Sequence, residues 1–384
     1  MKIVYLSNAF GHIPGPLCDK LYSTYGKEFT FIATGELSAD RKAIGSSAER
    51  DYIIHADDDK ETAKKLCADA DVLIFGLSPL EYIKDRINEN KLTIYYSERP
   101  FKGSWLRYCN PITYSHVKKR FILPSKNSNF YVLCASSFAS YDFDKIGAFK
   151  NKAYKWGYQP TIYEKNVDEL ISAKPQEGTS LIWVGRLVKL KHADHAIKVV
   201  YNLKKRGVQT HLKIVGTGEE ENDLKKLAQK LDVANNVDFL GRCDIATTRK
   251  LMDEANVFLF TSDAKEGWGA TLNESMNSAC ACVCSHLAGA TNFLVQDNYN
   301  GFVYKSGDLK QLTEKTETLI KNKELREQFG SKAYDTIFNL WNPEKSYERF
   351  IALIEELKEK GNCDLFISGP CSKALPLKKD WYKK

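Results

Sequence analysis

The chain has 384 residues, 43% of them hydrophobic and 27% charged, and 56 Lys and Arg against 49 Asp and Glu give a net charge of +7. This composition excludes extended disorder, a collagen-like fibre and a small disulfide scaffold, and the length predicts two domains at about 150 residues each. No apolar run approaches the ~18 residues of a membrane-spanning helix, and the first residues lack a signal-peptide core. We therefore expect a cytoplasmic protein, and its mildly basic charge suits anionic small molecules or an acidic membrane surface.

The first half of the chain alternates short apolar segments with polar segments of helix length. The apolar segments predict strands at 2–7, 29–34, 72–76, 92–97 and 130–134. Strands that alternate with helices pair in parallel, so this half predicts a Rossmann-like α/β domain over residues 1–158. A stretch with two prolines and no hydrophobic period follows, and we interpret residues 159–178 as an interdomain linker.

The second half repeats this pattern over a predicted Rossmann-like domain of residues 179–342. Near-continuous apolar strands are typical of a parallel sheet covered on both faces, and we expect them at 181–185, 211–216, 236–241, 257–262 and 281–285. Amphipathic helices lie between them, for example at 219–231. The C-terminal segment 343–384 opens with a long helix at 343–359, with Pro343 in its first turn, and ends in a basic tail. Two such doubly wound domains predict a substrate cleft between them.

The ten cysteines show no metal-binding or redox spacing. Cys280, Cys282 and Cys284 alternate within CACVCS, as small buried residues of one strand do. We therefore expect free thiols in a reducing compartment.

The strongest motif is EGWGATLNES, which runs from Glu266 to Ser275 between an expected strand and a helix. A Gly-containing turn in that position presents free backbone N–H groups and predicts a phosphate site at 269–272. Glu266 and Glu274 bracket the turn with seven residues between them. From spacing alone, a polar loop with a Glu at the helix start fits equally well.

Two further Gly-containing turns follow strands of the second half. In VGRLVKLKH, Arg186 leaves a strand at a Gly and Lys191 comes five residues later. Two cations at a strand exit suit a diphosphate, although ordinary surface cations remain the alternative. The other turn, VGTGEEEN at 215–222, lacks GxGxxG spacing, and its acidic helix start disfavours phosphate.

The chain resembles the retaining nucleotide-sugar glycosyltransferases of family 4 in five segments that follow one another in the family's order: GRLVKLK, IVGTGEE, FLGR, EGWGATLNESMNSAC and NYNGFVY. The resemblance implies the GT-B fold, in which two Rossmann-like domains face each other across a cleft and the C-terminal helix returns to the first domain. The first half looks like a bacterial subgroup that builds surface polysaccharides, in SNAFGHIPGPL, YYSERPFKGSW, LCASSFASYDF and YKWGY. Two positions depart from the pattern: His192 replaces a usual Gly, and Ala279 stands where Gly is frequent.

The resemblance implies a donor site in the second domain and an acceptor site in the first. Arg186 and Lys191 would bind the donor diphosphate, Glu274 the ribose hydroxyls, and Glu266 the transferred sugar. The remaining donor contacts would come from residues beside the nucleobase and from backbone amides of the turn: Gly241, Arg242, Gly269, Ala270, Thr271 and Leu272.

His12 lies in the loop after the first strand, which would border the cleft. The resemblance favours a role near the reacting sugar or the acceptor. An ordinary polar residue before a helix fits as well, and His116 is an alternative candidate.

Cleavage of a sugar–diphosphate bond leaves negative charge on the nucleotide, which fixed cations and amide dipoles can stabilise without a metal. The DxD motif, the usual metal motif of the other transferase architecture, occurs at 69–71 and 142–144. The first copy directly precedes a strand and should end a helix at the wrong edge of the sheet, and the second lies far from the diphosphate motifs. We therefore expect no metal and no cofactor beside the UDP- or GDP-sugar substrate.

Residues 101–126 contain six Lys or Arg and no acidic residue, interleaved with Trp105, Tyr108, Tyr114 and Phe121. Basic and aromatic side chains together suit the headgroup layer of an anionic membrane, and the tail KALPLKKDWYKK repeats this chemistry. Solvated basic surface with packing aromatics is the alternative. No RNA-binding motif is present, so we expect no nucleic-acid partner.

The sequence as a whole favours a metal-independent retaining glycosyltransferase. It would move a sugar from a nucleoside diphosphate to a glycan, lipid-linked at the inner face of the cytoplasmic membrane. A nucleotide-sugar epimerase of the same architecture would need an acid/base carboxylate set in the first half, and none is evident. A catalytically silent sugar-nucleotide-binding subunit is the third interpretation.

Overall fold

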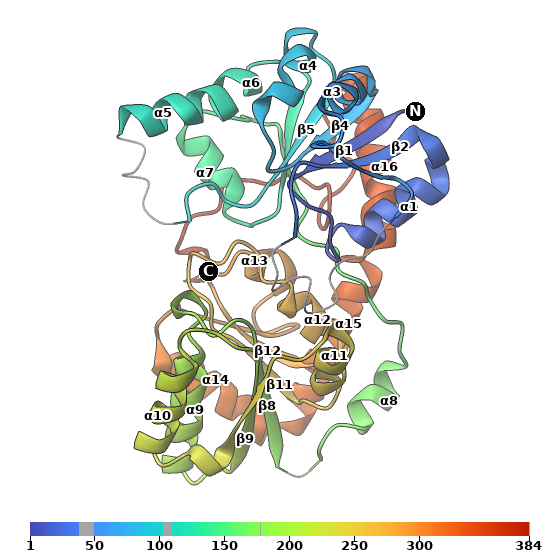
Figure 1. Cartoon of the computed structure of the whole chain (residues 1–384). Helices are drawn as coiled ribbons and strands as arrows, with labels where there is room; N and C mark the ends of the chain where they lie inside the picture. The colour runs from blue at the N-terminus through green and yellow to red at the C-terminus, as the bar shows by residue number, and fades with distance from the viewer. Residues whose placement is uncertain (38–49, 103–109, 177, 384) are drawn as a thin grey trace. The chain divides into compact units, whose positions relative to one another are not determined.

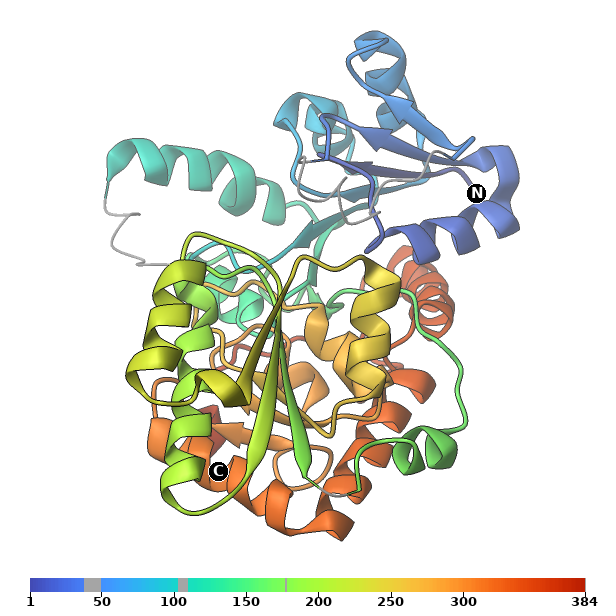
Figure 2. The ribbon, with the colours of Figure 1, turned by 60° about the horizontal axis from the view of Figure 1, so that its bottom comes forward.

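The computed structural model describes residues 1–37, 50–102, 110–176 and 178–383. The chain forms two compact units, Met1–Thr161 with Trp341–Lys378 and Ile162–Leu340 with Lys379–Lys384. Each unit is a parallel β-sheet covered by helices, as the labelled ribbon of Figure 1 and the turned view of Figure 2 show. The predicted α/β architecture of two Rossmann-like units is confirmed.

The sheet of the first unit has the strand order β3-β2-β1-β4-β5-β6-β7. Its strands are β1 (Ile3–Ser7), β2 (Phe29–Ala33), β3 (Ile53–His55), β4 (Val72–Phe75), β5 (Thr93–Ser97), β6 (Phe130–Cys134) and β7 (Ala153–Lys155). Its helices are α1 (Gly15–Tyr25), α3 (Lys60–Asp69), α4 (Lys84–Asn88), α5 (Pro111–Val117), the π-helix η4 (Lys118–Ile122), α6 (Leu123–Ser125) and α7 (Ala139–Lys145). All strands predicted for this half are confirmed. The two missed strands, β3 and β7, have three residues each and form the sheet edges.

The sheet of the second unit has the order β10-β9-β8-β11-β12-β13. Its strands are β8 (Thr179–Val184), β9 (Thr210–Val215), β10 (Val237–Gly241), β11 (Val257–Phe260), β12 (Ala281–Ser285) and the unpredicted β13 (Phe302–Tyr304). Its helices are α8 (Val167–Ser172), α9 (Ala193–Lys205), α10 (Glu221–Lys230), α11 (Ile245–Asp253), α12 (Thr271–Asn277), α13 (Thr291–Leu294), α14 (Leu309–Lys321) and α15 (Lys323–Asn339). Every residue of β12 is buried, including the alternating Cys282 and Cys284, as expected.

The segment predicted as a linker is partly helical. From Ile162 onward it belongs to the second unit and contains α8. The Asn166 side chain begins this helix by accepting hydrogen bonds from the backbone amides of Asp168 and Glu169, at 3.1 and 3.3 Å. The described residues from Ile162 onward are therefore part of the folded second unit.

Helix α16 (Pro343–Lys360) returns to the first unit, as the resemblance implies. Asn342 caps it by accepting a hydrogen bond from the Lys345 amide at 2.7 Å. Its apolar face joins the core of the first unit, and the Phe350 ring lies 5.5 Å from that of Trp156. Pro343 in the first turn and Gly361 in the left-handed conformation at the end account for its length.

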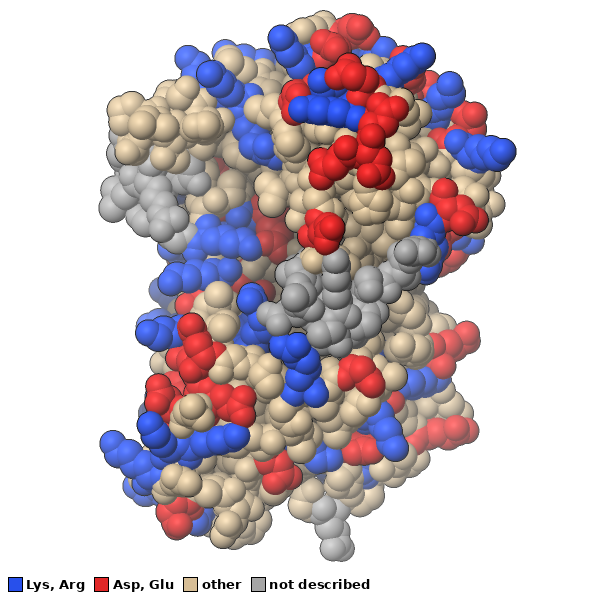
Figure 3. All heavy atoms as spheres, viewed as in Figure 1, with Lys and Arg blue, Asp and Glu red and all other residues tan. Residues whose placement is uncertain are grey.

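On the face shown in Figure 3, Lys and Arg are interspersed with Asp and Glu. The net positive charge of the chain therefore forms no single basic patch on this face. Within the described residues, no helix is long and apolar enough to cross a membrane.

Because α16 supplies part of the first core, truncation of its buried aromatic should weaken that unit. We expect Phe350→Ala to lower the free energy of unfolding of the first unit by about 3–5 kcal/mol, as large-to-small core substitutions do. Urea unfolding followed by tryptophan fluorescence measures this, with Glu355→Ala on the exposed face of the same helix as the control. Equal unfolding midpoints for the two variants would contradict the packing described.

Candidate functional site

The strand order of the second sheet reverses between β8 and β11. In open α/β sheets, ligands bind at the carboxyl ends of the strands at such a switch point. The loop after β8 carries Arg186 and Lys191, and the loop after β11 carries Glu266. The two strongest predicted motifs therefore meet at one edge of one sheet.

Lys191 and Glu266 form an ion pair between these two loops. The Lys191 ammonium contacts Oε2 of Glu266, and the two side chains are only 15% and 12% exposed. The Ser262 hydroxyl donates a hydrogen bond to the same carboxylate oxygen at 3.1 Å. Burial removes most of the hydration of both charges, so the position of each depends on the other.

A buried hydroxyl fixes the backbone beneath this pair. Thr261 directly follows β11 and donates to the Lys191 carbonyl at 2.6 Å, while it accepts from the Trp183 indole N–H at 2.9 Å. Trp183 belongs to β8. The side chain of Thr261 thus joins both central strands to the loop that presents Lys191.

The turn between Glu266 and α12 requires glycine at its centre. Gly269 has φ +95°, and a Cβ there would lie 2.3 Å from the Phe260 ring. In the described part of the chain, the amides of Gly269, Ala270 and Thr271 donate no hydrogen bond, whereas the Leu272 amide donates to the Gly269 carbonyl at 3.0 Å. The Thr271 hydroxyl is also buried without a partner there. Three of the four amides predicted to bind phosphate thus have no hydrogen-bond acceptor among the described residues, whereas the amide of Leu272 is already hydrogen-bonded.

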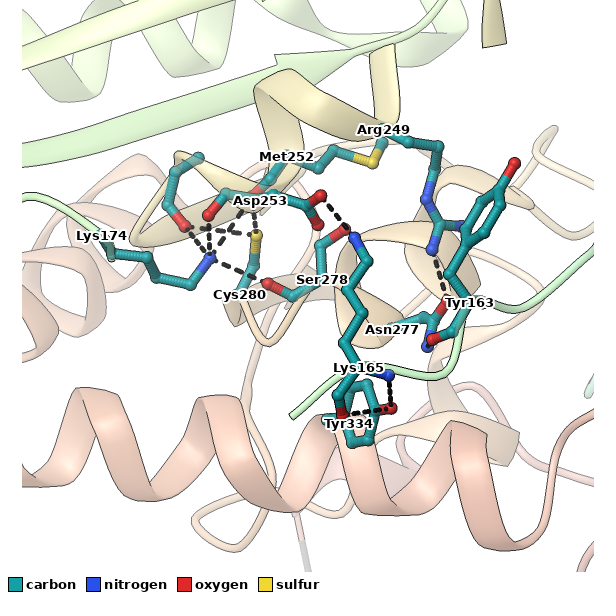
Figure 4. Close-up of polar contacts among 11 residues, drawn as sticks. Tyr163, Lys165, Lys174, Arg249, Met252, Asp253, Asn277, Ser278, Cys280 and Tyr334 are labelled. Carbon is teal, nitrogen blue, oxygen red and sulfur yellow. Dashed lines mark hydrogen bonds and ion pairs between the residues drawn. The ribbon is translucent and has the colours of Figure 1, made fainter. Parts of the chain in front are cut away.

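Glu274 lies on α12 behind the turn and is half-buried. Burial raises the pKa of its carboxyl, and the nearby guanidinium of Arg249 opposes that rise. Arg249 comes from α11 and lies against the Tyr163 ring, as Figure 4 shows. The carboxylate predicted to bind the ribose hydroxyls therefore has a buried cation close to it.

The other predicted donor residues lie along the same sheet edge. Arg186 and Arg242 are exposed, after β8 and β10 respectively. The Gly241 carbonyl accepts from the Gly216 amide at 2.7 Å. At Gly216, φ is +133°, and a Cβ would lie 1.9 Å from the Gly185 carbonyl oxygen. The glycines of the VGTG motif thus allow neighbouring strand ends to approach closely.

Both departures from the family pattern occur at left-handed backbone positions: φ is +51° at His192 and +48° at Ala279. Glycine adopts this conformation without steric cost, which accounts for its frequency in the family. The His192 ring lies 3.7 Å from Asp194 and 3.4 Å from Asp263. Its interaction with Asp194 raises the pKa of His192, so the charged form is favoured here.

His192, Asp194 and His195 have ligand-type atoms within 4.8 Å of one another. The two imidazole rings stack at 4.6 Å. The Asp194 carboxylate is also in contact with the Lys198 ammonium, at 2.6 Å. The cluster therefore already contains a cation of the protein, paired with its one carboxylate.

His12 lies in the first unit, in the turn after β1, and is half-buried. The strand order of the first sheet reverses between β1 and β4, so this loop lies at that sheet's switch point. The alternative candidate, His116, is exposed on α5.

The two DxD segments have structural roles in the first unit. Asp69 is the last residue of α3, as expected, and Asp71 accepts a hydrogen bond from the Lys2 amide at 2.8 Å. Asp142 is buried and accepts two hydrogen bonds from the Arg99 guanidinium, at 2.9 and 3.0 Å. Burial raises the pKa of Asp142, and Arg99 opposes this shift.

Sequence reasoning missed the side chains that hold the site together, namely Thr261, Ser262 and Arg249. Thr261 and Ser262 stand directly before the EGWG motif, where a hydroxyl pair at a strand end is a usable signal. Arg249 lies in an ordinary amphipathic helix, and nothing in its local pattern distinguishes it from a surface cation.

Two Rossmann-like parallel-sheet units in one chain are the architecture of the GT-B fold. The solved structure of HepE from Anabaena in complex with UDP superimposes with a TM-score of 0.72, over 93% of this chain and 100% of that chain. The two sequences are 16% identical, so this likeness concerns the fold.

Residues 164–336 match the family model described as glycosyl transferases group 1. The second unit therefore carries a glycosyltransferase group 1 domain. An uncharacterized glycosyltransferase of Haemophilus influenzae is 29% identical over 157 residues, 41% of this chain and 44% of that protein. The lipopolysaccharide core biosynthesis glycosyltransferase LpsE of Rhizobium meliloti is 27% identical over 188 residues, 49% and 53% of the two chains. The chain matches about half the length of these curated relatives.

Proposed function

We propose that this protein transfers a sugar, with retention of configuration, from a nucleoside-diphosphate sugar to a glycan acceptor. The observation that carries the proposal is the Lys191–Glu266 pair at the β8/β11 switch point, beside the unengaged amides of 269–271. HepE was solved with UDP, which favours UDP over GDP as the donor nucleotide.

The proposed chemistry uses fixed charges of the second unit. The departing nucleotide develops negative charge on its diphosphate, and Arg186, Lys191 and the turn amides would stabilise that charge in place of a metal. The Glu266 carboxylate would repel a diphosphate, so it should face the sugar, where positive charge develops. Retention would then follow from attack on the same face, guided by the departing phosphate, with no covalent bond to Glu266. His12 would act near the sugar or the acceptor.

Two other functions make different demands on the chain. An epimerase of this architecture would need acid and base carboxylates in the first unit, where Asp142 is committed to Arg99. A silent binding subunit would not need Glu266, which is held by Lys191 and Ser262. Both alternatives are separated from transfer by the release of nucleoside diphosphate.

One prediction concerns this release and the absence of a metal requirement. Incubation with UDP-sugars and glycan acceptors, lipid-linked ones included, should release UDP, and EDTA should leave the rate nearly unchanged. A coupled assay for free nucleoside diphosphate measures both, with GDP-sugars as the comparison. Strict dependence on Mg²⁺ or Mn²⁺ would contradict the metal-independent mechanism, and nucleotide binding without release would contradict transfer.

A second prediction separates the two carboxylates. Contacts of Glu274 to the ribose would exist in both ground and transition states, so Glu274→Gln should mainly raise KM for the donor, about tenfold. Glu266 would face the sugar while the charge of the sugar changes, so Glu266→Gln should lower kcat by roughly 10²-fold and weaken UDP binding by less.

Steady-state kinetics and calorimetric UDP binding distinguish these effects, and Glu324→Gln, exposed on α15, is the control. If Glu266→Gln keeps the wild-type kcat while Glu274→Gln abolishes chemistry at unchanged affinity, the two roles are reversed.

We also propose that the acceptor is presented at an anionic membrane surface, for surface polysaccharide synthesis. LpsE acts in lipopolysaccharide core synthesis. In this protein, α5, η4 and α6 run on as one helical stretch (Figure 2), which exposes Ile112 by 71%, Tyr114 by 48% and Leu123 by 47%. Exposed lysines follow on the same stretch, at Lys118, Lys119 and Lys126. Apolar and basic groups on one exposed helix suit a headgroup layer.

Not every residue of the basic segments supports this proposal. The Arg120 guanidinium packs over the Phe75 and Tyr95 rings at 5.3 and 5.5 Å, and Phe121 is buried. Trp105 and Tyr108 lie outside the described residues. In the tail, the Trp381 indole donates to the His286 carbonyl at 3.1 Å, and the Tyr382 ring packs against His286. The membrane proposal therefore rests on α5, η4 and α6.

A third prediction tests this surface. Vesicles of phosphatidylcholine with phosphatidylglycerol should bind the protein in a flotation assay, and 1 M salt should release it because the Debye length falls to about 3 Å. The double variant Lys118→Glu/Lys119→Glu should lose binding, whereas Lys225→Glu/Lys226→Glu on exposed α10 positions makes the same charge change and should retain it. Equal binding to neutral and anionic vesicles would contradict the proposal.

A further inference from the structure

Arg249 is a buried cation that the predicted site residues leave unexplained. It is 4% exposed on α11, and its guanidinium lies 4.9 Å from the centre of the Tyr163 ring. One of its terminal nitrogens donates to the Asn277 side-chain oxygen, as Figure 4 shows. Its Nε is buried and has no hydrogen-bond partner among the described residues. A buried guanidinium needs a compensating negative charge.

Two carboxylates lie near Arg249, those of Asp253 and Glu274. Asp253, on the same helix, already has a cation, because its Oδ2 pairs with Lys165, while its Oδ1 is buried without a partner among the described residues. The Lys174 ammonium is satisfied by backbone carbonyls, at 2.9 Å from Asp253 and 2.7 Å from Ala255. Burial raises the pKa of the neighbouring Cys280 to about 12, so this thiol is neutral. Glu274 has no ion pair and no hydrogen-bond donor to its carboxylate within the described part of the chain. It lies one turn before Asn277 on α12, and Arg249 is the cation that acts on it.

The guanidinium is held from two sides by the segment that begins the second unit. Asn277, at the end of α12, accepts a hydrogen bond from the Tyr163 amide at 2.8 Å and donates to the Tyr163 carbonyl at 3.0 Å. The same Asn277 oxygen accepts from Arg249. Tyr163 therefore lies against the guanidinium with its ring and is joined by its backbone to the helix that carries Glu274.

We propose that Arg249 is a positioning residue for Glu274: its buried guanidinium favours the charged carboxylate, which accepts hydrogen bonds from the ribose hydroxyls of the donor. This inference rests on the proposed function and deepens it. Tyr163 and Asn277 hold the guanidinium in place, so the segment after Ile162 would support the nucleotide site through Arg249.

The pH dependence of nucleotide binding follows from the charges. Burial raises the pKa of Glu274 and Arg249 lowers it. A protonated carboxyl is a poorer acceptor, so binding should weaken as the pH falls through this pKa. Loss of the cation raises the pKa further, because an adjacent opposite charge shifts a carboxyl by about 1–3 pH units. The weakening should then begin at a higher pH.

The test is calorimetric binding of UDP to the whole protein between pH 5.5 and 8.5, with GDP as the comparison. Arg249→Met should weaken binding about tenfold near neutral pH and shift the onset of weakening upward, whereas Arg249→Lys should restore most of the affinity. Titration of the UDP terminal phosphate is common to all variants and cancels in the ratio to wild type. In the Glu274→Gln background, Arg249→Met should have no further effect on the pH profile.

Two outcomes would overturn the inference: an equal loss of affinity in both backgrounds, or a pH profile that Arg249→Met leaves unchanged. Should Arg249→Met fail to fold, Tyr163→Leu removes the ring while the charge stays, and should shift the profile in the same direction by less. Tyr163→Phe keeps the ring and should bind as wild type does; identical profiles for the Leu and Phe variants would again contradict the inference. If wild type binds neither UDP nor GDP, the proposed function fails and this inference with it.

Discussion

The Lys191–Glu266 ion pair is the interaction on which the second unit's site depends. It joins the loops that leave the two central strands, and both charges are largely withdrawn from water. Desolvation of a buried ion pair costs free energy, and the attraction of the two charges offsets this cost only when further hydrogen bonds support them. Here Ser262 donates to the carboxylate and Thr261 holds the lysine backbone. The loops are therefore held in place by groups of the protein itself.

Backbone conformation imposes a second constraint on the same edge of the sheet. Gly216 and Gly269 stand where a Cβ would overlap neighbouring atoms. His192 and Ala279 also have positive φ, yet there the added side chain has space. Left-handed backbone costs an ordinary residue about 1–2 kcal/mol, and at His192 the contacts with Asp194 and Asp263 offset part of this cost. The glycines of these motifs are thus of two kinds: some stand where neighbouring atoms leave no space for a Cβ, and others stand where a side chain is tolerated at positive φ.

The sequence predicted the fold well because the long apolar strands carry a strong local signal, and it missed only strands of three residues such as β3, β7 and β13. It also placed Lys191 and Glu266 after strand ends, and such loops converge at the switch point of a parallel sheet. It did not predict their direct pairing, nor the contacts of Arg249 with Tyr163 and Asn277. Those contacts join residues far apart in the chain, and their geometry follows from tertiary packing, which single-sequence periodicity does not record. Helix α8, within the segment at 159–178, was not predicted for the same reason.

The two units differ in how much of each the comparisons cover. The match to the glycosyl transferases group 1 model begins at residue 164 and ends at 336, within the second unit, whereas the likeness to HepE extends over 93% of the chain at 16% identity. A shared fold with divergent residues is expected where one unit performs common chemistry and the other recognises different partners. Under the proposed function, the nucleoside diphosphate is the leaving group whichever acceptor is used. It would therefore need the same cations, amides and Glu274 environment in each case. The acceptor's identity must therefore be sought in the first unit, around the loop of His12 and the helical stretch from α5 to α6.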